Sequence, residues 1–278
     1  MMDHRMLILG AALFIDLVFG DPPNAFHPTA WMGSLITFFA NHAPKKVAGI
    51  QFVYGSMIIL FGGLIVGVTG WGLELLVQKF SLPVYLLLGG ILVKSTFTLR
   101  GLVNVSNQIV KSFQANDLEE ARCLVSWHLV GRDTTSLNTS QATAAAIESV
   151  AENTADSIVA PVFYYLLFGI PGALIYRFVN TSDALVGYRD EKREWLGKAS
   201  ARIDDLLNII PARLTALLFF FAAPFSGCDP INAVSTWRTD RYKTASPNAG
   251  HPMSMAAGGL GVKLEKVDHY VLGEDGRQ

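Results

Sequence analysis

Long apolar runs separated by short polar stretches dominate the first hundred residues. Residues 50–77 are apolar apart from two polar positions, and residues 82–99 form a second run whose one charge is Lys94. A helix of about 20 apolar residues can cross the roughly 30 Å hydrocarbon core of a bilayer. The pattern predicts two membrane helices joined at residues 78–81, with the Lys94 side chain extended toward the membrane surface.

A shorter apolar run, residues 6–20, is interrupted by Asp16. Residues 21–23 offer no small-residue cleavage site, so we interpret the run as a retained first helix rather than a signal peptide. Lysines at 45–46 precede the predicted hairpin and Arg100 follows it. Because cytoplasmic loops are enriched in Lys and Arg, both ends of the hairpin are predicted to be cytoplasmic and the N-terminus external.

Four regions follow from the pattern along the whole chain. They are the membrane helices of 1–100 with a polar loop at 20–49, cytoplasmic helices at 101–157, apolar segments of 158–226 around a polar loop at 177–205, and a polar tail at 227–278. Together they form one functional unit. The pattern predicts an all-α, polytopic helical membrane protein.

The apolar segment after residue 157 raises a problem of topology. If it crossed the membrane once, the basic residues between 189 and 202 would lie outside, against the tendency of Lys and Arg to stay inside. We therefore predict a re-entrant hairpin that enters at 158–168, turns near Pro171 and returns to the cytoplasmic side. Residues 206–225 are predicted to do likewise.

Composition supports a lipid environment. The chain of 278 residues is 51% hydrophobic and only 16% charged, with a formal net charge of -1, whereas soluble domains carry about 25% charged residues. With no basic surplus, nucleic acid is not an expected partner. Cys123 and Cys228 are far apart and lack nearby metal-ligand spacing, so neither a disulfide framework nor a zinc site is predicted.

Three carboxylates recur at every fourth position: Glu148, Glu152 and Asp156. That spacing places them on one side of a helix, just before it becomes apolar. Hard oxygen ligands suit Mg²⁺, so the stripe is a candidate magnesium site for a phosphorylated substrate. A solvated charged face is the alternative.

A second polar set flanks the later apolar segments and combines carboxylates, amides and a guanidinium. Its members are Asn180, Asp183, Arg202, Asp204, Asp205 and Asn208. Carboxylates with a nearby amide can hold a metal-bound phosphate. Simple helix capping by Asp204 or Asp205 is the alternative.

Cations and a histidine complete the candidate chemistry. Arg177 and Arg213 lie within or beside apolar segments, where a cation needs a partner or a polar cavity. Arg132 beside Asp133 could bind phosphate in bidentate fashion or form a loop ion pair.

His27 follows a Pro-rich loop, where a structural hydrogen bond is the alternative to catalysis. The stretch from Ser246 through Asn248 to Gly250 could present backbone amides to phosphate, although it is no recognised P-loop.

Six of these stretches, taken in order, resemble the cobalamin-biosynthesis membrane proteins called adenosylcobinamide-phosphate synthases. The matching stretches are Gly20-Asp21-Pro22-Pro23 with His27-Pro28, residues 129–134, residues 147–153 with Asp156, Asn180-Thr181-Ser182-Asp183, residues 202–205 with 210–215, and Ser246-Pro247-Asn248-Ala249-Gly250. They cover nearly the whole chain. His251 departs from the resemblance, because a Trp is expected there.

The resemblance implies an ATP- and Mg²⁺-dependent ligase. It would form an amide between a side-chain carboxyl of adenosylcobyric acid and the amine of (R)-1-aminopropan-2-ol or its O-phosphate. A carboxylate is unreactive toward an amine, so an acyl phosphate is the implied route. The resemblance further implies a cell-membrane location, an active site facing the cytoplasm, contact with lipid and association with other cobalamin-assembly enzymes.

Residue roles follow as hypotheses from the same resemblance. The metal ligands would be Glu148, Glu152, Asp156, Asp204 and Asp205. The catalytic group would comprise His27, Asp183 and Arg213, with His27 or Asp183 accepting the amine proton. Substrate and phosphate would be bound by Arg132, Asp133, Asn153, Arg177, Asn180, Arg202, Asn208, Ser246 and Asn248.

Two other classes use similar residues. An intramembrane prenyltransferase also carries Asp and Asn clusters with magnesium, but it needs two comparable Asp-rich motifs and more spanning helices. A transporter carries intramembrane charges, but its halves are expected to repeat. Neither alternative accounts for the whole chain.

Overall fold

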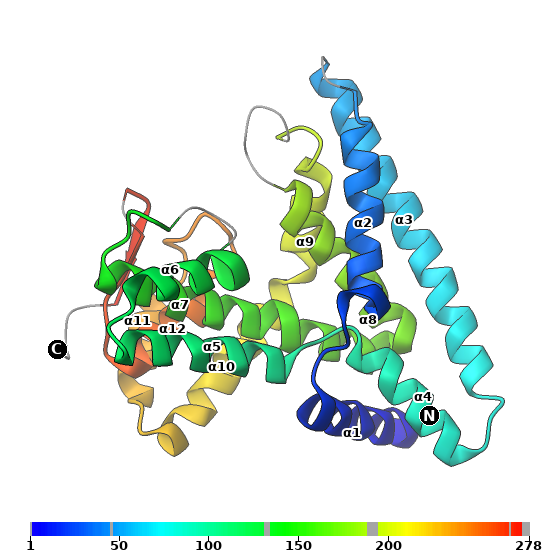
Figure 1. The fold of residues 1–278 in the computed structure, drawn as a ribbon, viewed down its shortest axis with the longest axis horizontal. Coiled ribbons are helices and arrows are strands. Elements are labelled where there is room, and N and C mark those ends of the chain that lie inside the picture. Colours follow the sequence, from blue (N-terminus) through cyan, green and yellow to red (C-terminus); the bar gives the residue numbers. More distant parts are fainter. Residues whose placement is uncertain (1, 45–46, 131–133, 188–193, 267, 274–278) are drawn as a thin grey trace. The chain divides into compact units, whose positions relative to one another are not determined.

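The structure, a computed structural model, contains helices and one short β-hairpin (Figure 1), which confirms the predicted all-α fold. It describes residues 2–44, 47–130, 134–187, 194–266 and 268–273. The chain divides into two compact units. Unit 1 comprises Met1–Arg100 and Ala160–Leu207, and unit 2 comprises Gly101–Val159 and Asn208–Gln278.

Unit 1 is built from six α-helices and one 3-10 turn. These are α1 (Met2–Phe19), η1 (Asn24–Phe26), α2 (Pro28–Asn41), α3 (Ala48–Val77), α4 (Leu82–Lys94), α8 (Ala160–Val186) and α9 (Lys198–Leu207). Helix α1 packs on α4, and α3 packs along α8. Gly62 permits the second contact, because a Cβ there would lie 2.2 Å from the Phe178 ring of α8.

Helix α8 is broken at Gly169, whose φ of +72° is readily adopted only by glycine. The rings of Tyr164 and Tyr176, on either side of the break, stack at 5.2 Å. Twelve residues of straight helix would separate them by about 18 Å. The chain therefore folds back here, beside the predicted turn at Pro171, and its two arms lie side by side.

Charged side chains satisfy the backbone at this reversal. Arg5 donates to the carbonyls of Leu166 and Leu167 at 2.8 and 3.0 Å, and Ile170 donates its N–H to Glu74. Irregular backbone is tolerated within a membrane only when protein groups replace water in this way. The geometry therefore suits the re-entrant hairpin, whose placement in a membrane stays a prediction.

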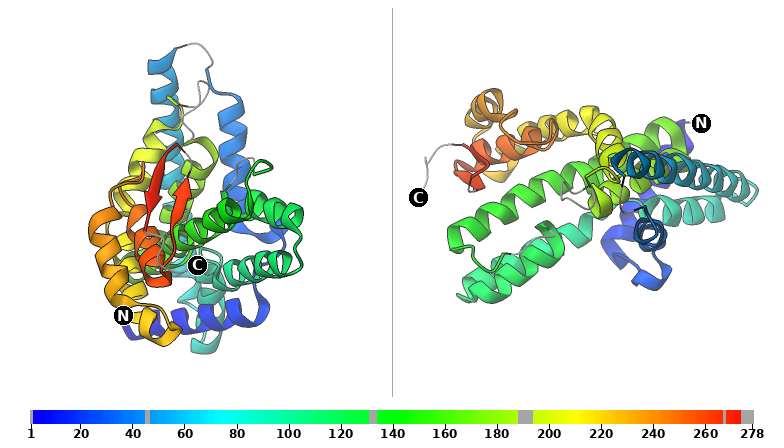
Figure 2. Two further views of the ribbon diagram at one scale, coloured as in Figure 1. Left: turned by 90° about the vertical axis from the view of Figure 1, so that its left-hand side faces the viewer. Right: turned by 90° about the horizontal axis from the view of Figure 1, so that it is seen from above.

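Unit 2 contains the remaining elements. They are α5 (Leu99–Gln114), α6 (Leu118–Val125), the π-helical η2 (Ser126–Val130), α7 (Thr139–Thr154), the π-helical η3 (Ala155–Val159), α10 (Ile209–Ala222), η4 (Ala223–Ser226), α11 (Pro230–Asp240), α12 (Gly250–Leu260), β1 (Leu264–Lys266) and β2 (Tyr270–Leu272). Figure 2 shows the antiparallel strands as red arrows. Their buried Leu264 and Leu272 join a core made by α7 and α12.

Local signals explain several boundaries in unit 2. Asp117 caps α6 by accepting the Glu120 N–H. Helix α7 passes into the π-helical turn η3, which lies just before Pro161. Proline has no N–H to donate back to the preceding turn, and this loss favours irregular hydrogen bonding just before it.

Three described helical stretches are long and apolar enough to cross a membrane: Ala48–Val77, Thr139–Val186 and Ile209–Ser226. Helices α4 and α5 meet at a bend of 45°, and they would form a fourth span if the two are counted together. Apolar side chains such as Leu64 and Phe61 of α3 are about 60% exposed. This arrangement is that expected of a helical membrane protein.

Candidate functional site

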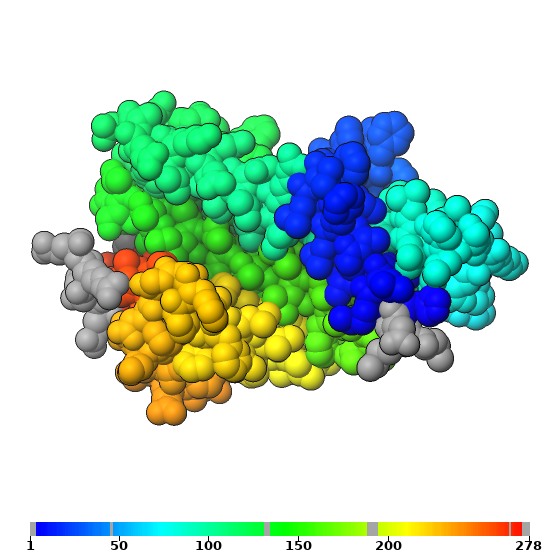
Figure 3. All heavy atoms as spheres, turned by 90° about the horizontal axis from the view of Figure 1, so that it is seen from below, coloured from blue at the N-terminus to red at the C-terminus, as the bar shows by residue number. Residues whose placement is uncertain are grey.

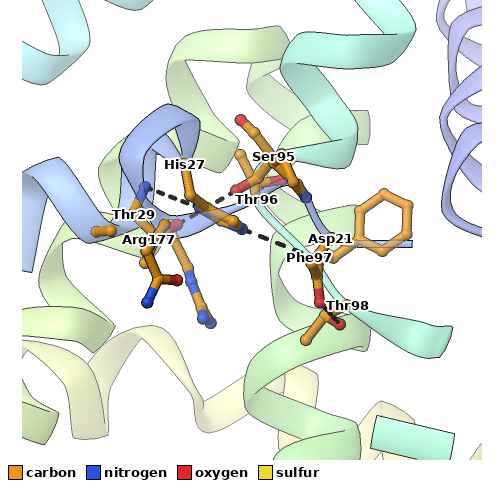
Figure 4. Close-up of a pocket in the computed structure, with 11 residues that line it drawn as sticks. Asp21, His27, Thr29, Ser95, Thr96, Phe97, Thr98 and Arg177 are labelled. Atoms are coloured by element: carbon orange, nitrogen blue, oxygen red, sulfur yellow. Dashed lines mark hydrogen bonds and ion pairs between the residues drawn. The ribbon is translucent and has the colours of Figure 1, made fainter. Parts of the chain in front are cut away.

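A polar cavity of about 330 Å³ lies in unit 1, between the loop after α1, the start of α2, the turn after α4 and helix α8. Figure 4 shows the side chains that converge there. They include Asp21, His27, Thr29, Ser95, Thr96, Thr98 and Arg177. Segments far apart in the sequence thus supply one set of charged and hydroxyl groups.

Asp21, in the wall of this cavity, belongs to a buried ion cluster centred on Lys94. Its ammonium lies 2.8 Å from the Asp16 carboxylate and also pairs with Asp21. Lys94 and Asp16 are 3% and 0% exposed, so the predicted extension of Lys94 to the membrane surface is wrong. Burial without a partner would cost several kcal/mol, and the two carboxylates hold the ammonium inside instead.

The same cluster fixes the turn after α4. Asp16 accepts the backbone N–H of Arg100 at 2.8 Å, and Thr98 donates its hydroxyl to Asp21 at 2.6 Å. Lys94 also donates to the carbonyl of Phe97 at 3.2 Å. These bonds stop α4 at Lys94, so the predicted helix of residues 82–99 ends early.

Asp21 is held as a carboxylate. Burial raises its pKa, but hydrogen bonds from His27, Lys94 and Thr98 outweigh burial and hold the pKa well below the ordinary range. Asp21 therefore stays ionised at neutral pH. It is suited to orienting a neighbouring donor rather than exchanging protons.

His27 caps α2 with its own ring. Its Nδ1 accepts the Thr29 N–H at 3.2 Å, and its Nε2 lies 3.9 Å from the Asp21 carboxylate. An occupied Nδ1 lone pair places the proton of the neutral ring on Nε2. His27 in this conformation can donate a hydrogen bond into the cavity. It could accept a proton only by releasing the Thr29 cap.

Arg177 links this cavity to the second polar set predicted from the sequence. Its Nη1 donates to Asn180 at 3.3 Å, and Asn180 donates to Asp204 of α9 at 3.3 Å. Asp183 and Asp205 interact electrostatically as like charges. The structure thus brings five predicted residues of α8 and α9 together, whereas Arg202 is exposed.

A second predicted group meets in unit 2. Arg213 donates to the Ile209 carbonyl at 2.6 Å and to Asn248 at 3.3 Å. The Asn248 N–H donates to the Ser246 hydroxyl at 3.2 Å. Asn208 is buried immediately before α10. The motif that begins at Ser246 therefore holds Arg213 through the side chain of Asn248.

The carboxylate stripe of α7 and η3 is only partly open. Glu148 is 5% exposed and accepts the Tyr270 hydroxyl at 3.1 Å, whereas Glu152 and Asp156 are half-buried. Asn153 lies between them, donates to the Ser149 carbonyl and accepts the Ser157 hydroxyl. The stripe is therefore no simple solvated face.

Magnesium binding by these groups stays a prediction. Within the described residues, no three His, Cys, Asp or Glu side chains gather closely enough to hold a metal ion. Mg²⁺ usually takes one or two carboxylates and completes its shell with water and substrate phosphate, so the oxygen donors present fit that ion. Arg132 and Asp133 lie outside the described residues.

Sequence reasoning missed three members of the ion cluster that holds Asp21: Asp16, Lys94 and Thr98. A signal for two of them was present, because Asp16 and Lys94 are opposite charges inside separate apolar runs. Such charges usually find each other within a membrane protein. Thr98 carried no comparable signal.

Several long apolar helices among the described residues are a feature of a multi-pass membrane protein. The chain belongs to the CobD/Cbib protein family, which matches residues 9–278.

Relatives in bacteria and archaea agree with this membership. A "Cobalamin biosynthesis protein CobD" of Dehalococcoides mccartyi (strain CBDB1) is 46% identical over 97% of this chain and 87% of its own. A "Probable cobalamin biosynthesis protein CobD" of Pyrococcus furiosus is 41% identical over 95% of this chain and 86% of its own. A protein of the same name from Methanocaldococcus jannaschii is 36% identical over 96% of this chain and 88% of its own. These names support a role in cobalamin biosynthesis. No solved structure matches the chain.

Proposed function

We propose that this chain is an ATP-dependent ligase of cobalamin biosynthesis. It joins (R)-1-aminopropan-2-ol, or its O-phosphate, to a side-chain carboxyl of adenosylcobyric acid. Family membership over residues 9–278 carries the proposal. The polar cavity supports it, because a guanidinium and a histidine donor there can neutralise charge on phosphoryl or acyl oxygens.

The proposed reaction has two steps. The carboxylate first attacks the terminal phosphorus of ATP, which releases ADP and leaves an acyl phosphate. The amine then attacks the acyl carbon, the C–N bond forms, and phosphate leaves with the bonding electron pair while the amine loses its proton. ATP and the corrinoid carboxylate are cytoplasmic reactants, so the proposed site faces the cytoplasm.

Side-chain roles follow from the described contacts. Arg177, fixed by Asn180, would neutralise oxyanion charge, and the Nε2–H of His27, which faces Asp21 at 3.9 Å, would turn to the same oxygen when substrate binds. Asp183, rather than His27, would accept the amine proton, because the Nδ1 of His27 already accepts the Thr29 N–H. Asp21 would orient the His27 ring.

Mg²⁺ would be held by one of the two predicted carboxylate sets, each within a single unit, and would neutralise phosphoryl charge. Its candidates are Glu148, Glu152 and Asp156 in unit 2, and Asp204 and Asp205 in unit 1. Each set supplies hard oxygen donors.

A coupling assay tests the proposal. Purified protein in detergent is incubated with adenosylcobyric acid, aminopropanol phosphate, ATP and Mg²⁺, and the amide product is measured by mass spectrometry together with ADP. Product should form only when ATP is present. Parallel reactions with free aminopropanol determine which amine is used. No amide with either amine, from protein that remains folded, would refute the proposal.

Replacing Arg177 by Gln should lower kcat/KM by about a hundredfold or more, the scale for removing one oxyanion donor. Lys79→Gln is the matched control, because Lys79 is exposed in the loop between α3 and α4. Equal activity of the two variants would remove Arg177 from the proposed site.

A further inference from the structure

A separate cavity of about 560 Å³ lies in unit 2, between α10, α11 and α12. Its wall combines the guanidinium groups of Arg213, Arg238 and Arg241 with the apolar side chains of Leu217 and Phe220. None of the described residues that line it is acidic. The cavity thus pairs excess positive charge with an apolar surface.

Aromatic rings preorganise part of this charge. The Arg241 guanidinium lies 4.4 Å from the Trp237 ring centre and 4.7 Å from that of Tyr242. It also donates to the Trp237 and Arg238 carbonyls. A guanidinium fixed by cation–π contacts retains free N–H donors and loses little entropy on binding an oxyanion.

A buried histidine fixes the Trp237 ring of this wall. His251 is 1% exposed and lines the cavity, and its Nδ1 accepts the Trp237 indole N–H at 3.0 Å. An indole only donates, so the proton of neutral His251 lies on Nε2. Among the described residues, that Nε2 has no hydrogen-bond partner. That nitrogen has almost no accessible surface, so His251 holds the Trp237 ring in the wall and leaves the ligand contacts to the arginines.

The surroundings indicate which kind of anion fits. Helix α10 belongs to a candidate membrane span, Ile209–Ser226, and Leu217 and Phe221 on it are about half exposed. Figure 3 shows α10 and α11, yellow to orange, as a continuous exposed surface. Trp, Tyr and Arg are characteristic of the membrane interface, where basic pockets bind lipid head groups.

We propose that this cavity binds an anionic membrane phospholipid. Its phosphate would accept from Arg238 and Arg241, and its acyl chains would lie along Leu217 and Phe220.

The test is a titration of the full chain, purified in a nonionic detergent, with short-chain phosphatidylglycerol and, separately, phosphatidylcholine. Isothermal calorimetry measures each affinity. Phosphatidylglycerol should bind more tightly. Arg238→Gln and Arg241→Gln should each weaken it by about tenfold, as expected for one charge-assisted hydrogen bond. Arg238 is exposed, so its replacement leaves the fold intact.

Lys111→Gln is the matched control, because it removes an exposed charge of unit 2 outside the cavity and should leave binding unchanged. Inorganic phosphate and ATP are added as competitors and should not displace the lipid. Equal binding of both lipids, or full affinity in both arginine variants, would overturn the proposal. Displacement by phosphate or ATP would also overturn it and assign the cavity to a soluble phosphoryl compound.

Discussion

At the scale of single residues, Lys94 stabilises unit 1 because its ammonium neutralises two carboxylates, those of Asp16 and Asp21. Lys94→Met keeps the length of the side chain but leaves Asp16 and Asp21 without their shared cation. We expect the free energy of unfolding to fall by about 3–5 kcal/mol, the cost of leaving a buried charge uncompensated. Denaturant titration in detergent, followed by circular dichroism, measures the loss.

Two comparisons separate this effect from a general loss of charge. Lys79→Met removes an exposed ammonium and should change the unfolding free energy by less than about 1 kcal/mol. Adding Asp16→Asn to Lys94→Met should recover part of the loss, because one buried negative charge disappears. Additive destabilisation in the double variant would contradict the ion-cluster account.

His251 should make stability depend on pH. Burial and the guanidinium groups of Arg213 and Arg241 lower its pKa to about 4, from about 6.5 in an unfolded chain. Between these values the unfolded chain binds a proton that the native chain does not, so stability falls as pH falls. The loss attributable to His251 is on the order of 3 kcal/mol and is complete below pH 4.

Thermal unfolding between pH 7.5 and 4.5 measures this dependence, and His251→Gln should flatten it. His269→Gln is the control, because His269 is an exposed histidine of the same unit. Identical pH profiles for wild type and His251→Gln would show that His251 is protonated equally in both states.

At the scale of elements, the contact of α3 with α8 offers a matched pair of neighbouring glycines. A Cβ at Gly62 would lie 2.2 Å from the Phe178 ring, whereas a Cβ at Gly63 meets nothing within 4 Å. Gly62→Ala should destabilise the protein by about 1–3 kcal/mol through overpacking. Gly63→Ala should be neutral or slightly stabilising, because alanine favours the helix.

The same contact connects packing to the site, since Phe178 is next to Arg177 in α8. Gly62→Ala should therefore also lower coupling activity, and Gly63→Ala should not. Melting temperatures and the coupling assay, measured on both variants, report the two effects. Equal behaviour of the variants would contradict the close approach of α3 and α8.

The elements also show how far sequence patterns reach. The apolar run of α3 is a local signal, and this helix formed as predicted. The hairpin of β1 and β2 carried no such signal, since strands of three residues are too short for a periodicity and are stabilised by burying Leu264 and Leu272 on α7 and α12. Tertiary packing, absent from any local window, decides such elements.

The candidate site divides in the same way. Arg177, Asn180 and Asp204 were predictable because charges and amides beside apolar segments are unusual, and the structure joins all three. The pairing of Lys94 with Asp16 could not be predicted from the sequence. It depends on the packing of α1 against α4, and 77 residues separate the two side chains along the chain. Nor could residue type alone reveal that the cap on Thr29 occupies the Nδ1 of His27.

At the scale of the whole molecule, the reversal at Gly169 bears on how the chain crosses the membrane. Because the arms before and after Gly169 lie side by side, a chain that enters with the first arm can return with the second. Arg5 and Glu74 satisfy the backbone at the turn, which removes the main cost of a re-entrant hairpin. The basic region around Lys198 would then stay in the cytoplasm, in agreement with the positive-inside tendency.

Accessibility of single cysteines tests this topology. Cys123 and Cys228 are first replaced by Ser, and cysteines are then introduced singly at Lys192 and Lys198. Intact cells are treated with a membrane-impermeant thiol reagent, and lysed cells serve as the control for reactivity. Both positions should react only after lysis, because a hairpin returns them to the cytoplasmic side. Labelling of both in intact cells would mean that the segment from Ile158 to Tyr176 crosses the membrane completely, and the basic residues after it would then lie outside despite their charge.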